Sequence, residues 1–273
     1  MKKSENQKIC GASWLHSKQD SQSLEKLKLF EAHYKNMDGL LKYKVAEQVK
    51  NNRTHFGRLL YKTKDCYIDN MNFNEFICSV IDCAGRDKLI EGIDKAIKII
   101  LKNNKDLKDK YTRKDIEKAI KIYMYYQPYI GYAFEQYIRD LIKSDDNYEI
   151  YTSDTLDLKY AIDMQVLSKK HNKVIGLQLK TFSFLNLSID DRKEYKFKNT
   201  QAIREKWCND VYYVFHSHNG NLLSNNYMAL THYIEACKSI DNFIVLEEEK
   251  WFIKELHEAF EGIDNVEEDR NLW

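Results

Sequence analysis

Two short segments decide how this chain folds: Ala161-Ile162-Asp163-Met164-Gln165-Val166-Leu167 and Val174-Ile175-Gly176-Leu177-Gln178-Leu179-Lys180. In each segment apolar side chains occupy every second position, which is the period of a β-strand with one buried face. A polar run at 169–173 separates the segments and has the composition of a turn. The pattern predicts an antiparallel pair of strands over 160–167 and 174–184.

Three polar side chains interrupt the apolar pattern of this hairpin. Gln178 and Lys180 lie two positions apart and therefore point to the same side of their strand. If the two strands pair through the turn, Asp163 converges with them at one end of the sheet. A lysine and an aspartate among apolar neighbours cost free energy unless they pair or bind an ion. Two interpretations follow: an ordinary Asp163–Lys180 salt bridge, or a catalytic centre.

The flanking sequence extends the hairpin into an α/β pattern. The first 145 residues have mostly helical periodicity, and Pro128 is expected to break the helices on either side of it. From residue 130 onward the predicted elements are a helix at 132–142, strands at 148–151 and in the hairpin, a helix at about 196–208, strands at 211–215 and 242–246, and a closing helix at 247–260.

This order resembles the PD-(D/E)xK nuclease superfamily over residues 130–217. The matching residues are Gly131-Tyr132-Ala133-Phe134-Glu135 on the helix, Asp163 on one strand, and Gln178-Leu179-Lys180 on the next. The resemblance implies an α/β fold with a central mixed β-sheet flanked by helices, in a domain over 129–273. Residues 1–128 would form a largely helical, basic region for DNA binding or dimerisation.

The sequence departs from the family pattern at two positions. Ile162 precedes Asp163 where the signature has proline, and Gln178 replaces an acidic residue. An amide offers a metal only its uncharged carbonyl oxygen, so a second carboxylate is needed. Either Glu135 or Glu194 is a candidate for this role. We favour Glu135, because the first core helix of the family often contributes an acid.

The resemblance implies Mg²⁺-dependent hydrolysis of phosphodiester bonds, with Mn²⁺ as a substitute. A hard divalent cation needs oxygen ligands and neutralises charge that develops on the phosphate. Asp163 would be the central ligand, beside Glu135, Gln178 and the backbone carbonyl of Leu179. Lys180 would hold the attacking water and stabilise the transition state.

The charge distribution points to a polyanionic partner, although the formal net charge of the chain is only +1. Residues 1–130 carry 26 basic and 17 acidic side chains, while residues 241–273 carry 3 and 11. The acidic tail is expected to face away from DNA. Basic residues interleaved with aromatic ones suit a phosphate backbone with stacked bases. The candidate nucleic-acid-binding residues are Tyr195 and the four basic residues that surround it and Phe197, which are Arg192, Lys193, Lys196 and Lys198. Arg53 and Arg58 are further candidates.

The lack of a recognisable targeting signal and the pattern of cysteines favour a cytoplasmic protein. The sequence has no apolar run of signal-peptide or membrane-span length and no glycine-rich phosphate loop, so neither a membrane nor a nucleotide cofactor is expected. The six cysteines match no zinc pattern and are expected to act as small hydrophobes in a reducing compartment.

The preferred interpretation is a type II restriction endonuclease that cuts double-stranded DNA as a homodimer. Within the enzymes, the alternative is a repair, recombination or other defence nuclease of the same core. Because Gln178 replaces an acid, a second alternative is a non-catalytic nucleic-acid-binding protein on a degenerate nuclease fold. A third alternative is a helical interaction protein in which Asp163 and Lys180 form only a salt bridge.

Overall fold

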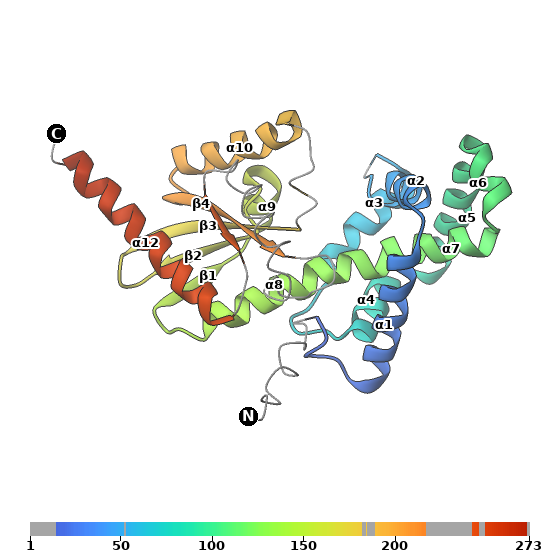
Figure 1. Cartoon of the computed structure of the whole chain (residues 1–273), viewed down its shortest axis with the longest axis horizontal. Coiled ribbons are helices and arrows are strands. Elements are labelled where there is room, and N and C mark those ends of the chain that lie inside the picture. The colour runs from blue at the N-terminus through green and yellow to red at the C-terminus, as the bar shows by residue number, and fades with distance from the viewer. Residues whose placement is uncertain are drawn as a thin grey trace, which may run out of the picture. The chain divides into compact units, whose positions relative to one another are not determined.

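A computed structural model describes residues 15–51, 53–181, 184, 189–216, 242–245 and 249–271. The chain divides into a helical unit, Leu15–Ala133, and an α/β unit formed by the residues from Phe134 onward (Figure 1). The sequence placed the boundary at residue 128, and the structure places it within a long helix, α8 (Gln127–Lys143). None of the described helices is long and apolar enough to cross a membrane.

In the helical unit, polar capping residues mark the starts of several helices. Its elements are α1 (Ser21–Asn36), α2 (Gly39–Val49), α3 (His55–Tyr61), the 3₁₀ turn η2 (Lys62–Cys66), α4 (Phe73–Ala84), α5 (Arg86–Asn103), α6 (Lys105–Lys110), α7 (Arg113–Lys121), the π-helical turn η3 (Ile122–Tyr126) and the start of α8. Asn72 and Glu75 form a capping box at α4, and Thr112 and Asp115 form one at α7. Each box satisfies backbone N–H groups that the first helical turn leaves without partners.

Pro128 does not break the chain of helices, so that prediction was wrong. The π-helical turn η3 immediately precedes it, and the N–H of Gln127 donates to the carbonyl of Ile122, five residues earlier. A proline inside an α-helix clashes with the carbonyl four residues before it, and the wider π turn changes that register. The helix therefore continues from α7 through η3 into α8.

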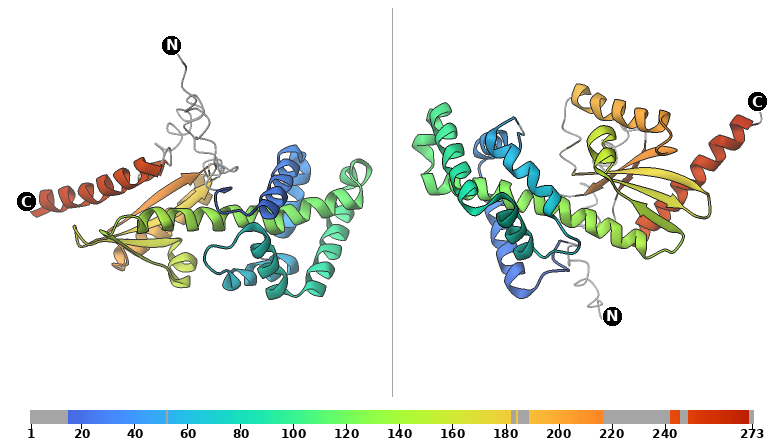
Figure 2. Two further views of the ribbon diagram at one scale, coloured as in Figure 1. Left: turned by 90° about the horizontal axis from the view of Figure 1, so that it is seen from below. Right: turned by 180° about the vertical axis from the view of Figure 1, so that it is seen from behind.

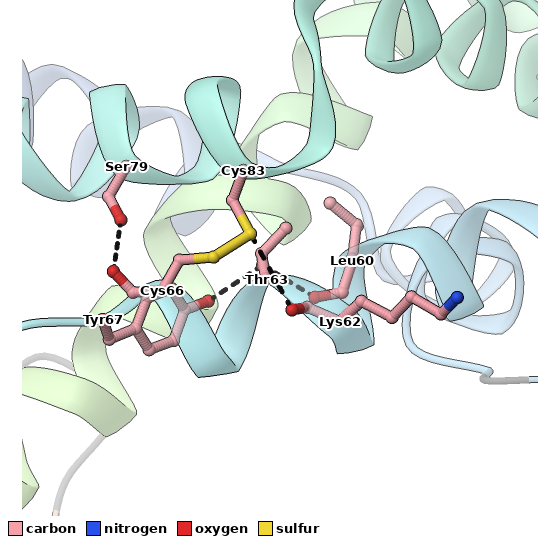
Figure 3. The surroundings of a disulfide bond; sticks show 7 residues. All are labelled: Leu60, Lys62, Thr63, Cys66, Tyr67, Ser79 and Cys83. Carbon is pink, nitrogen blue, oxygen red and sulfur yellow. Dashed lines mark hydrogen bonds between the residues drawn. A yellow bond between two sulfur atoms is a disulfide. The ribbon is translucent and has the colours of Figure 1, made fainter.

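A disulfide joins Cys66 at the end of η2 to Cys83 in α4 (Figure 3). The two residues are 17 positions apart in sequence, and their Cα atoms are 6.3 Å apart. The hydroxyl of Ser79 also donates a 2.8 Å hydrogen bond to the carbonyl of Cys66, which holds the same two elements together. The expectation that all cysteines are unpaired was therefore wrong for this pair, because folding brings together positions that are distant in sequence. Cys78 and Cys208 are free.

The α/β unit is built on one five-stranded mixed sheet, which confirms the predicted α/β class. After α8 its elements are β1 (Tyr148–Tyr151), α9 (Asp154–Tyr160), β2 (Met164–Ser168), β3 (Lys173–Thr181), α10 (Ile189–Arg204), β4 (Asp210–His216), β5 (Phe243–Val245) and α12 (Glu249–Asn271). The strand order is β1-β2-β3-β4-β5. The pairs β1–β2 and β2–β3 are antiparallel, whereas β3–β4 and β4–β5 are parallel.

Helices cover both faces of this sheet (Figures 1 and 2). On one face, Val211 of β4 forms a buried cluster with side chains from α9 and α10, among them Tyr160 and Ala202. On the other face, the hydroxyl of Tyr212 donates a 3.4 Å hydrogen bond to the carbonyl of Ala259 in α12. Because neighbouring residues of a strand point to opposite faces, Val211 and Tyr212 place these helices on opposite sides of the sheet.

Several predicted boundaries differ from those in the structure. Helix α9 was missed, and Tyr160, expected at the start of a strand, is its last residue. Strand β3 ends at Thr181 rather than at 184, and α10 spans 189–204 rather than 196–208. Helix α9 has only seven residues, and its buried residues Leu156 and Tyr160 are too few to produce a clear helical period.

Candidate functional site

The end of α9 determines where Asp163 lies. Ala161 adopts a left-handed backbone conformation with φ of 55°, which ends the helix. The N–H of Ile162 then returns to the carbonyl of Leu156, and the N–H of Asp163 donates to the carbonyl of Leu177 in β3 at 2.9 Å. The turn therefore places Asp163 beside β3, one residue before β2 begins.

A second hydrogen bond fixes the carboxylate of Asp163 on β3. The backbone N–H of Leu179 donates to Oδ2 of Asp163 at 2.6 Å. Leu179 lies between Gln178 and Lys180 in β3. The carboxylate is therefore held at the part of β3 from which the side chains of these two residues project. The predicted convergence of Asp163 with this part of β3 is present in the structure.

Close packing next to Asp163 requires a glycine in β3. A Cβ atom at Gly176 would lie 2.9 Å from Cδ1 of the buried Ile162 side chain. Real Cβ atoms do not approach that closely. Gly176 thus allows Ile162, and with it Asp163, to lie against the strand.

The electrostatic environment of Asp163 disfavours an isolated negative charge. Burial raises the pKa of its carboxyl group to about 6, and the positive charge of Lys180 and the N–H of Leu179 oppose that shift. The carboxylates of Asp157 and Glu135 raise the pKa further. A cation beside Asp163 would relieve this cost, so the site suits a positively charged ligand.

Gln178 presents a buried oxygen that lacks a hydrogen-bond donor. Its side chain is 1% exposed, and its Oε1 atom has no partner among the described residues. A buried carbonyl oxygen without a partner costs about 1–3 kcal/mol. Asp163, Gln178 and the carbonyl of Leu179 are therefore a chemically reasonable set of oxygen ligands for Mg²⁺.

The two candidates for a second carboxylate have different surroundings. Glu135 on α8 pairs with Arg139 at 2.6 Å, its side chain is 34% exposed, and its charge acts on Asp163. Glu194 on α10 pairs with Lys198 at 3.0 Å and is 70% exposed. Across the described part of the chain, no three His, Cys, Asp or Glu side chains group as a metal site would require. A metal here would need the amide and backbone oxygens as well, and Glu135 is the better placed acid.

Lys180 lies over an aromatic ring from α10. Its ammonium nitrogen is 5.2 Å from the centroid of Tyr195. Tyr195 is half-buried and faces the sheet, whereas Phe197, two residues later, is 66% exposed. The exposed aromatic side chain on α10 is therefore Phe197.

The predicted nucleic-acid-binding residues fall into two groups. On α10, Lys193 and Lys196 are exposed, while Arg192 and Lys198 are half-buried. These four side chains share one helix with Tyr195, next to β3. Two other predicted residues are exposed in the helical unit, Arg53 before α3 and Arg58 within it.

Sequence reasoning missed two features of the site. Asp157 on α9 adds negative charge near Asp163, and Asn199 on α10 donates a 2.8 Å hydrogen bond to the hydroxyl of Tyr213. Ser153, which caps α9 by accepting from the N–H of Leu156, was the signal that would have revealed the helix carrying Asp157. Asn199 had no comparable signal, because its partner lies on another element.

Comparisons of this chain with protein-family models, with curated proteins and with solved structures found no match.

Proposed function

We propose that this protein is a Mg²⁺-dependent endodeoxyribonuclease with a PD-(D/E)xK-like core. The observation that carries the proposal is the hydrogen bond from Leu179 to the half-buried carboxylate of Asp163, beside Lys180. An acid, an uncharged oxygen ligand and a lysine thus meet at one point of the sheet. Phosphodiester hydrolysis needs a site for a hard cation next to a positively charged side chain.

The topology of the sheet supports the same proposal. An antiparallel pair, β2 and β3, is followed by α10 and then by the parallel strand β4. This is the order of elements that the resemblance to PD-(D/E)xK nucleases implies. Helix α9 is an addition between β1 and β2 that the resemblance did not include.

Each residue of the site has a distinct task in this proposal. Asp163, Glu135, Gln178 and the carbonyl of Leu179 would hold Mg²⁺, or Mn²⁺ in its place. The bound cation would neutralise charge on the scissile phosphate. Lys180 orients the attacking water and donates hydrogen bonds to the phosphate oxygens as negative charge develops. The basic side chains of α10 contact the phosphate backbone on either side.

The substrate proposed is double-stranded DNA, and the biological role is that of a type II restriction enzyme. Two copies of the chain would cut the two strands, since one site hydrolyses one strand and a palindromic sequence matches two-fold symmetry. A repair, recombination or other defence nuclease would have the same chemistry without a fixed cleavage sequence.

Digestion of unmethylated plasmid DNA with Mg²⁺ tests both levels of the proposal. We expect cleavage by the wild-type protein, and loss of cleavage in Asp163→Ala and Lys180→Ala variants that keep wild-type circular dichroism. Discrete fragments with mapped ends indicate a restriction enzyme, and a smear indicates a general nuclease. Wild-type rates in either folded variant would refute the assignment.

Gln178 favours a second candidate, a non-catalytic nucleic-acid-binding protein on a degenerate nuclease fold. The amide occupies the position of an acid, and no three acidic, histidine or cysteine side chains within the described ranges form a metal group. Salt-sensitive DNA binding without cleavage in Mg²⁺ or Mn²⁺ would select this candidate. Failure to bind DNA at all would favour a protein in which Asp163 and Lys180 are merely structural.

A further inference from the structure

The inner surface of α10 carries two polar side chains one turn apart. Tyr195 and Asn199 are four residues apart and therefore lie on the same side of the helix. Both are directed toward the sheet face that bears Lys180. The sequence suggested that Tyr195 stacks on nucleic-acid bases, but its ring already has protein neighbours.

Aromatic packing fixes the ring of Tyr195. The ring meets Phe184 edge-on, with centroids 5.2 Å apart and an interplanar angle of 80°. Phe184 in turn packs against Tyr213 at 5.5 Å and against Phe215 at 6.3 Å. Phe184 and Phe215 are buried, so the ring of Tyr195 packs against a buried apolar surface.

A buried hydrogen bond holds α10 in the position that this packing requires. Asn199 is 6% exposed, and its Nδ2 donates to the hydroxyl of Tyr213 at 2.8 Å. Tyr213 lies directly beside Gln178 in the parallel register of β3 and β4. The bond thus ties α10 to the two strands at the level of the candidate site.

Lys180 depends on this arrangement because its side chain is long and flexible. Its ammonium group lies 5.2 Å from the centroid of Tyr195, and its positive charge acts on the carboxylate of Asp163. A cation above an aromatic face is attracted by the electrons of the ring. The ring therefore restricts where the ammonium group can go.

We propose that Tyr195 is a positioning residue, whose ring holds the ammonium group of Lys180 beside Asp163 and Gln178 for catalysis. Asn199 contributes by fixing the helix that carries the ring. This inference rests on the proposed nuclease function, but the contact itself can be measured without any activity.

The test combines NMR with steady-state cleavage kinetics on the full chain. The variants are Tyr195→Leu, which removes the ring, and Tyr195→Phe, which keeps it. Tyr151→Leu is the control, because Tyr151 is an exposed tyrosine on β1, at the edge of the same sheet. The NMR readout is the ring-current shift of the Lys180 ε-methylene protons. The kinetic readout is kcat and KM for Mg²⁺-dependent cleavage of plasmid DNA.

We expect the wild-type and Tyr195→Phe proteins to share an upfield Lys180 signal and a similar kcat. Tyr195→Leu should lose the shift and lower kcat by roughly three- to thirtyfold, the factor that corresponds to one cation–π contact, with KM unchanged. Tyr151→Leu should change neither readout.

Three results would overturn the inference, and the first two are a Lys180 signal at the free-lysine position in the wild-type protein and an unchanged kcat in Tyr195→Leu. Loss of kcat in Tyr195→Phe as well would assign the effect to the hydroxyl group and would also contradict it. A wild-type protein that does not cut DNA would instead refute the proposed function. The shift alone would then show whether the ring holds Lys180.

Discussion

The backbone N–H of Leu179 donates a 2.6 Å hydrogen bond to the carboxylate of Asp163, and this bond joins two segments that are 16 residues apart. This donor and the charge of Lys180 offset only part of the effect of burying the carboxyl group, so its pKa remains raised, at about 6. The folded state therefore binds a proton on Asp163 more tightly than the unfolded state does. This imbalance has a consequence for stability.

Replacement of Asp163 by asparagine should stabilise the protein at neutral pH. A carboxyl group whose pKa rises from 3.8 to about 6 on folding destabilises the folded state once it ionises, by about 2–3 kcal/mol above pH 6. The penalty grows as pH rises through the range between these values and disappears below pH 4. Asparagine keeps an oxygen that can accept from Leu179.

Urea unfolding of the wild-type protein and Asp163→Asn at pH 4, 5, 6 and 7.5 measures this difference. We expect no gain at pH 4 and a gain of about 2 kcal/mol at pH 7.5. The opposite trend, with Asp163→Asn less stable at high pH, would mean that a favourable interaction of the ionised carboxylate outweighs its burial.

Replacement of Gln178 by leucine should separate metal dependence from folding. The Oε1 atom of Gln178 is buried and has no hydrogen-bond partner among the described residues, so its removal should raise the free energy of unfolding by about 1–3 kcal/mol. If that oxygen is a ligand, the Mg²⁺ concentration for half-maximal cleavage should rise by about tenfold or more. Titration of cleavage with Mg²⁺ and urea unfolding without metal measure the two effects. An unchanged Mg²⁺ requirement would remove Gln178 from the ligand set.

The contact between Gly176 and Ile162 predicts a compensating pair of substitutions. An alanine at 176 would bring its Cβ to 2.9, 3.2 and 3.3 Å from three carbons of Ile162, and such overpacking costs about 1–3 kcal/mol. Gly176→Ala should therefore destabilise the α/β unit, and the added substitution Ile162→Val should recover part of the loss. A double-mutant cycle in urea measures the coupling. Strictly additive effects would show that the two residues do not compete for space.

The sequence predicted the sheet but not the way the site is assembled. Alternating apolar residues located β2 and β3, and a continuous apolar run at 211–215 located β4. The same alternation placed Gln178 and Lys180 together, since they share one strand. Helix α9 was not predicted, because a segment of seven residues is too short to show a helical period. The bond between Asn199 and Tyr213 and the Tyr195–Lys180 contact depend on how α10 packs, which no local pattern encodes.

The disulfide offers a prediction that concerns only the helical unit. A cross-link that closes a loop of about this size stabilises a protein by about 2–4 kcal/mol, mainly by restricting the unfolded chain. Reduction with dithiothreitol, or Cys83→Ser, should lower the unfolding midpoint of the helical unit and leave that of the α/β unit unchanged. Cys78→Ser is the matched control, because Cys78 is a free, exposed cysteine on the same helix. Differential scanning calorimetry with and without reductant measures the shift. Equal effects of Cys78→Ser and Cys83→Ser, or no effect of reductant, would show that the cross-link does not stabilise this unit.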